Sequence, residues 1–160
     1  MVQSRLGGPP IPWPIIWASL GTPLSDATEE RNWRKMLHRA IFTRNQDPKA
    51  PSHACRLNCG CRDASMIHLV QCRYTKAYWI AVMTFVYKIL KVPHEHFIQT
   101  LIILNISRGT LINTEARAFT RHAFNAFYRD IAMVDTHNKR FNWKKTFKQA
   151  MTTYHRAVLR

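Results

Sequence analysis

Apolar residues recur at helical spacing in several stretches of this chain, so the pattern predicts a mainly α-helical protein. The clearest stripe belongs to a helix that Asn113 or Thr114 would cap and that ends near Val134. A last helix is predicted from about Trp143 to Leu159. The inner faces of these two helices would consist of Phe119, Ala123, Phe127, Ile131 and Val134, and of Trp143, Phe147, Met151, Tyr154 and Val158.

Weaker patterns predict the other helices. Thr22-Pro23 or Ser25 would start one that runs to about Thr43, with apolar residues at helical spacing along one face. Another is predicted over residues 75–91, and residues 95–106 fit either a short helix or a strand. We therefore expect about five helices around one core.

The first 22 residues have a different character. They contain four prolines, at positions 9, 10, 12 and 14, which oppose a continuous helix. We expect an extended Pro-rich arm over residues 1–22, with Trp13 and Trp17 as anchors onto the body. The chain would then divide into this arm, a helical body over residues 23–135 and a basic C-terminal helix over residues 136–160.

The net charge of the chain indicates which class of molecule it binds. The 160 residues include 24 Lys+Arg and only 9 Asp+Glu, a formal net charge of +15. Such a surplus favours a polyanionic partner, and nucleic acid is the commonest one. We expect no membrane insertion, because no stretch approaches the roughly 20 uninterrupted apolar residues of a spanning helix.

Two clusters of cations are candidate phosphate contacts. No acid follows Asp135, so the cations of the C-terminal segment are uncompensated and would face away from its apolar stripe. The second cluster lies on the helix near residues 25–43, where it could equally complement the helix dipole, with Glu29 and Glu30 at the opposite end. The candidates are Lys139, Arg140, Lys144, Lys145, Lys148 and Arg156, and then Arg31, Arg34, Lys35 and Arg39.

All four cysteines fall between residues 55 and 72, which is unlike a disulfide framework spread through a secreted fold. Cys55 with Cys59, and His68 with Cys72 one helical turn apart, would supply the four ligands of a structural zinc site. Cys61 could replace Cys59 as a ligand, although we expect Cys59. The alternative is that the cysteines are only small buried hydrophobes.

Several motifs together resemble a known zinc-binding region. They are Trp17-Ala18-Ser19-Leu20, the run from Trp33 to Arg44, the cysteines, His68-Leu69, and Cys72 followed by Trp79. Residues 15–80 in this way resemble the region that follows the reverse transcriptase of LINE-type non-LTR retrotransposons.

The resemblance implies that Cys55, Cys59, His68 and Cys72 hold Zn²⁺ and that Trp79 packs behind the site. Two departures affect the first ligand pair. Three residues separate Cys55 from Cys59 where two are usual, and the acid often found before the His-Leu pair is displaced to Asp63. No polymerase metal motif is present. The resemblance therefore implies a nucleic-acid-binding appendage without a polymerase.

The sequence therefore predicts a zinc-binding protein that binds nucleic acid, with RNA favoured. We expect it to act with other subunits of a ribonucleoprotein, such as an organellar ribosome. We expect no enzymatic activity, because the sequence lacks paired carboxylates, nucleophile-base spacing and a phosphate-cradling glycine loop. Two alternatives stay open: an appendage of a retroelement reverse transcriptase complex, and a zinc-stabilised protein-interaction subunit. We expect an intracellular protein, and the sequence does not decide between mitochondrion, another organelle and nucleus.

Overall fold

A long central helix, α7 (Thr114–His137), organises the structure, which is a computed structural model. The structure describes residues 12–19, 26–37, 54–62, 66–92, 104–137 and 140–160. The other described elements are α2 (Trp13–Ala18), α3 (Ala27–Leu37), α4 (Met66–Gln71), α5 (Lys76–Lys88), β1 (Ile106–Ser107), β2 (Thr110–Leu111) and α8 (Trp143–Val158). The prediction of a mainly helical fold is confirmed.

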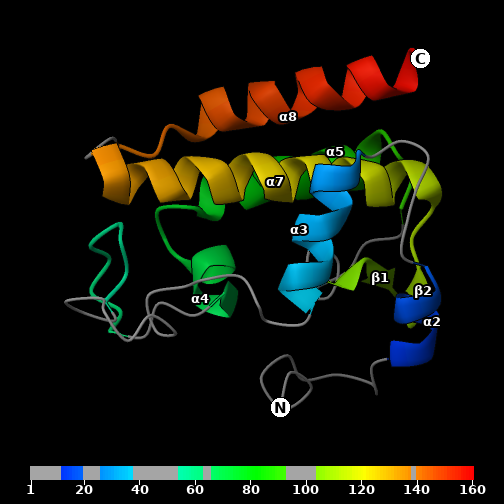
Figure 1. The fold of residues 1–160 in the computed structure, drawn as a ribbon, viewed down its shortest axis with the longest axis horizontal. Coiled ribbons are helices and arrows are strands. Elements are labelled where there is room, and N and C mark those ends of the chain that lie inside the picture. The colour runs from blue at the N-terminus through cyan, green and yellow to red at the C-terminus, as the bar shows by residue number, and fades with distance from the viewer. Residues whose placement is uncertain (1–11, 20–25, 38–53, 63–65, 93–103, 138–139) are drawn as a thin grey trace.

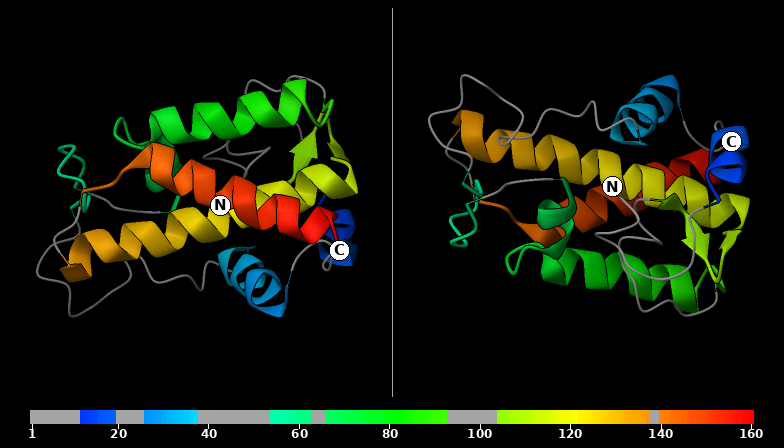
Figure 2. Two further views of the ribbon diagram at one scale, coloured as in Figure 1. Left: turned by 90° about the horizontal axis from the view of Figure 1, so that it is seen from above. Right: turned by 90° about the horizontal axis from the view of Figure 1, so that it is seen from below.

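The other long helices pack around α7 (Figure 1). Figure 2 shows α5 and α3 on opposite sides of α7, with α8 lying across α5 and α7. The segment that carries the cysteines lies toward one end of α7, and α2 with the β-hairpin lies toward the other end.

The core is built on the predicted stripe of α7. Phe119, Ala123, Phe127 and Ile131 are all buried, and only Val134 is half-buried. Aromatic rings from α5 close over this stripe: the ring centroids of Phe85 and Phe119 are 4.4 Å apart, and those of Trp79 and Phe127 are 4.8 Å apart. Asn113 caps the helix as predicted, because its Oδ1 accepts the Ala116 N–H at 2.8 Å.

Helix α8 turns a slightly different face inward from the one predicted. Its buried residues are Thr146, Ala150 and Tyr154, which are spaced four apart. Trp143, Phe147 and Met151 are half-buried beside them. Val158, expected on the inner face, is 43% exposed, because it lies at the end of the helix beyond the packed part. Ala150 and Tyr154 join the same core as α7, so the basic C-terminal helix is part of the helical body.

Helix α3 starts later than predicted, at Ala27, because Asp26 caps it. Asp26 Oδ1 accepts the Glu29 N–H at 2.8 Å, and Glu29 Oε2 accepts the Asp26 N–H at 3.1 Å. The two acids expected to complement the dipole also bind α7. Glu29 pairs with His122 in a buried contact, and Glu30 Oε1 lies 2.5 Å from Arg121 Nη1.

Two short elements were not predicted. Residues 13–18 form a helix where an extended arm was expected, because Pro12 and Pro14 lie at its start, where a missing N–H costs no hydrogen bond. Trp13 and Trp17 pack against the core from this helix, as predicted for anchors. Ile106 pairs with Leu111 and Ser107 with Thr110 in a two-stranded hairpin that is too short to leave a periodic signal. Residues 1–11, 20–25 and 38–53 lie outside the described residues.

None of the described helices is both long enough and apolar enough to cross a bilayer.

Candidate metal centre

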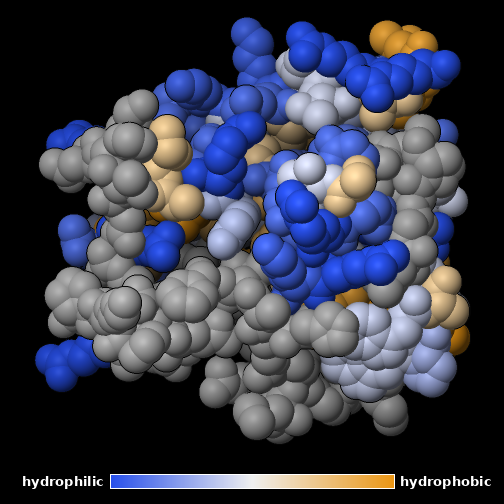
Figure 3. Space-filling view, in the orientation of Figure 1, coloured by the Kyte–Doolittle hydropathy of each residue, from blue (hydrophilic) through white to orange (hydrophobic). Residues whose placement is uncertain are grey.

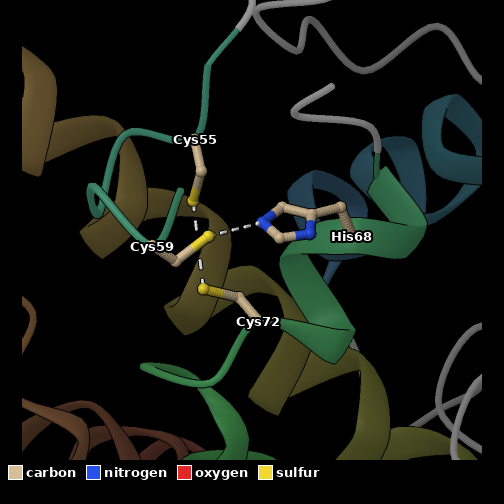
Figure 4. Close-up of side chains that lie close together, drawn as sticks. All are labelled: Cys55, Cys59, His68 and Cys72. Carbon is tan, nitrogen blue, oxygen red and sulfur yellow. Dashed lines mark hydrogen bonds between the residues drawn. The ribbon is translucent and has the colours of Figure 1, made fainter. Parts of the chain in front are cut away.

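The first two ligand candidates lie on a tight loop, residues 54–62. The Cys55 N–H donates to the Cys61 carbonyl at 2.9 Å, and the Asn58 N–H donates to the Cys55 carbonyl at 3.0 Å. Asn58 and Gly60 have positive φ angles of 55° and 93°, which glycine and asparagine tolerate best. This backbone path brings the Cys55 and Cys59 side chains to the same side of the loop (Figure 4).

The other two candidates come from the short helix α4 and from the residue that follows it. His68 lies within α4, and Cys72 follows its last residue. The Thr75 N–H and hydroxyl both donate to the Cys72 carbonyl, at 3.0 Å and 3.1 Å, and so close a turn between α4 and α5. Val70 and Thr75 are buried, which attaches this turn to the helical body.

These four side chains converge on one point, as Figure 4 shows. Their ligand atoms all lie within 4.8 Å of one another. The Cys55 and Cys72 sulfurs are 3.9 Å apart, and Cys59 Sγ is 3.3 Å from His68 Nε2. Ligand atoms bound tetrahedrally at about 2.0–2.3 Å from a zinc ion lie about 3.3–3.8 Å from one another. The four residues therefore lie close enough to hold a metal ion.

The three thiols of the group differ in how easily they ionise. Burial raises the pKa of Cys55 to about 12 and also raises the pKa of Cys72. Burial opposes ionisation of Cys59 as well, but hydrogen bonds from the Cys61 backbone N–H and from the other two thiols outweigh it and lower the Cys59 pKa. Cys59 is thus the easiest of the three thiols to ionise. A divalent cation would supply the charge that three thiolates need.

The two alternatives for the second ligand, Cys59 and Cys61, differ in their position relative to the convergent group. Cys59 belongs to the convergent group and Cys61 does not. Cys61 instead contributes backbone groups to the loop, through its carbonyl and its N–H. None of the four cysteines forms a disulfide. Trp79, which the resemblance places behind the site, is fully buried against Phe127.

The predicted phosphate contacts are exposed wherever the structure describes them. Figure 3 shows hydrophilic side chains gathered over α3 and α8. On α8 and just before it these are Arg140, Lys144, Lys145, Lys148 and Arg156, and on α3 they are Arg31, Arg34 and Lys35. Lys139 and Arg39 lie outside the described residues. The two clusters come from separate helices that pack on different sides of α7.

Two residues at the metal centre were not singled out from the sequence. Arg73 follows Cys72, and its positive charge contributes to the low pKa of Cys59. Tyr74 comes next, and its side chain is 49% exposed. The sequence does contain a pattern that could have indicated these two residues: residues 64–94 include cations but no Asp or Glu.

No protein-family model, curated protein or solved structure matches this chain.

Proposed function

We propose that this protein binds a structural zinc ion through Cys55, Cys59, His68 and Cys72 and uses its basic helices to bind nucleic acid, with RNA as the favoured partner. Three thiolates and one imidazole are a ligand set that suits zinc. They fill all four tetrahedral positions and leave no place for a metal-bound water. A closed site of this kind stabilises a fold, so we infer a structural and non-catalytic role.

The observation that carries the nucleic-acid proposal is the outer face of α8. Lys144, Lys145, Lys148 and Arg156 are all exposed there, while the opposite face packs into the core. The helix contains no acidic residue, and among the described residues none of these cations is in an ion pair with a carboxylate. Such a rigid, uncompensated row of cations suits phosphate contact, which positions a nucleic acid without base-specific readout.

The proposed setting is a ribonucleoprotein, such as an organellar ribosome, with other protein subunits as neighbours. It rests on composition: a small chain with a net charge of +15 needs a polyanion to neutralise it. Purification of the tagged full chain, with sequencing of the nucleic acid and identification of the proteins that accompany it, tests this setting. Recovery of a reverse transcriptase and its template would favour the retroelement alternative.

A salt titration of the full chain on RNA tests the binding itself. Each phosphate neutralised by Lys or Arg releases counterions, so log affinity should fall with log salt by about 0.7–0.9 per contact. Elemental analysis should give one zinc per chain. A flat salt dependence together with stoichiometric zinc would favour a protein-interaction subunit, and a preparation without stoichiometric metal would contradict the zinc proposal.

A further inference from the structure

Tyr74 has an unusual position among the aromatic side chains. It is 49% exposed, whereas the other described aromatic side chains are buried or half-buried. Its exposure is set by the backbone: Cys72 is held at the candidate metal centre, and the turn from Cys72 to Thr75 is closed by two hydrogen bonds to the Cys72 carbonyl. Arg73 and Tyr74, the two residues inside this turn, are both exposed.

The two exposed side chains form a unit. The Arg73 guanidinium carbon lies 4.9 Å from the centroid of the Tyr74 ring, and Arg73 Nη2 donates to the Tyr74 hydroxyl at 3.2 Å. A planar cation stacked on an aromatic ring offers both a π surface and a positive charge. Single-stranded nucleic acids bind to such surfaces, because an unpaired base stacks on the ring while its phosphates meet nearby cations.

The charged residues that follow this unit in the sequence, up to residue 94, are all cations. The nearest of them, Lys76, lies in the first turn of α5 and is exposed. From residue 64 to residue 94 the chain contains no Asp or Glu. An acidic peptide would find charge here too, but it would leave the exposed ring without a stacking partner.

We propose that Arg73 and Tyr74 form a stacking site for an unpaired base of single-stranded RNA, separate from the phosphate-binding face of α8. This site deepens the proposed function and rests on it. The α8 face would hold phosphates of any nucleic acid, and the Arg73–Tyr74 unit would add a preference for unpaired over paired strands.

The test compares Tyr74→Ala, Tyr74→Phe and the unchanged full chain on a single-stranded RNA of about ten nucleotides and on an RNA duplex of the same length. Tyr74→Ala should weaken single-strand binding by about 5- to 150-fold, the range for loss of one base stack. Duplex binding should stay the same. The salt slope should not change, because no charge is removed. Tyr74→Phe should bind like the unchanged chain, since the ring remains.

Ile80→Ala is the matched control, because Ile80 is 50% exposed on α5 and should not affect either RNA. Zinc content and the far-ultraviolet circular dichroism of each variant report whether the fold is intact. Unchanged single-strand affinity in folded Tyr74→Ala would overturn the stacking site and leave the proposed function standing. Equal losses with Ala and Phe, or equal losses on single strand and duplex, would also overturn it. If the unchanged chain bound neither RNA, the proposed function itself would fail.

Discussion

The metal centre and the helical body of this protein are held together by different chemistry. In the helical body, Phe119, Phe127 and their aromatic neighbours on α5 and α8 are buried side by side, so burial of apolar surface holds the helices together. In the segment from Cys55 to Thr75, the described buried side chains are Cys55, Val70, Cys72 and Thr75. Two of those four are metal-ligand candidates. Few of the described residues of this segment thus bury apolar surface, and we expect its shape to depend on the ligand residues.

In the described residues, Leu57, Val70 and the turn after Cys72 join the two regions. Val70 from α4 belongs to the same core as α5 and α7, and the Thr75 hydrogen bonds to Cys72 join the metal segment to the start of α5. Because few of the described residues join the two regions, we expect that disruption of one region leaves much of the other intact.

Removal of the metal should have the largest effect. A structural zinc ion contributes about 10 kcal/mol or more of local folding free energy, so chelation or Cys72→Ser should unfold residues 54–75. The α7–α8 pair should stay helical, because its contacts do not involve the ligands. Hydrogen exchange should show loss of protection in the metal segment and retained protection in α7.

Cys61→Ser is the control for that experiment. Serine keeps the backbone carbonyl that accepts the Cys55 N–H, and the Cys61 thiol lies outside the convergent group. This variant should keep stoichiometric metal and normal exchange in the metal segment. If Cys61→Ser lost the metal and Cys59→Ser retained it, the ligand assignment would be wrong.

Phe119→Ala disrupts the helical body and not the metal segment. The ring is fully buried between Phe85 and Tyr154, so its loss should lower the free energy of unfolding by about 3–5 kcal/mol. Phe147→Ala should cost about half as much, since Phe147 is only half-buried. Denaturant melts give both values, and one metal ion per chain should remain bound to each variant under native conditions. Equal costs for the two variants would contradict this account of the core.

The α3–α7 contact is a third kind of interface, in which buried charges pair. Arg121 is buried, and its pKa is lowered by that burial while Glu30 opposes the shift. Glu30→Met should lower the free energy of unfolding by about 3 kcal/mol, because it leaves a buried cation without its carboxylate. We expect the low end of the usual cost of breaking a buried ion pair, because the Glu30 side chain is 14% exposed. Combining it with Arg121→Met should recover most of the loss, which a double-mutant cycle measures.

Replacement of Lys144, Lys145 and Lys148 by Ala should have the smallest effect on stability, within about 0.5 kcal/mol for each exposed site. Its effect should appear in RNA binding, where the salt slope should fall by about two to three units. Full retention of the slope would move the proposed binding surface to Arg31, Arg34 and Lys35 on α3.

Much of this architecture is determined by sequence patterns that act within one helix. The stripe from Phe119 to Ile131 and the Asn113 cap are recognisable because helical spacing and capping involve neighbours three or four residues apart. The density of cysteines around His68 pointed to a metal site for the same local reason. The helical stripes also placed Lys144 and Lys148 on the solvent face of α8, where the structure has them.

Other features were decided only by tertiary structure, because they depend on residues far apart in the chain. The choice of Cys59 over Cys61 follows from where α4 and the start of α5 place His68 and Cys72 against the loop. Glu29 and Glu30 looked like helix-terminal charges, yet their partners His122 and Arg121 lie about ninety positions later, where no local pattern connects them. The exposure of Tyr74 likewise depends on the placement of Cys72 at the candidate metal centre, because Cys72 begins the turn that carries Tyr74.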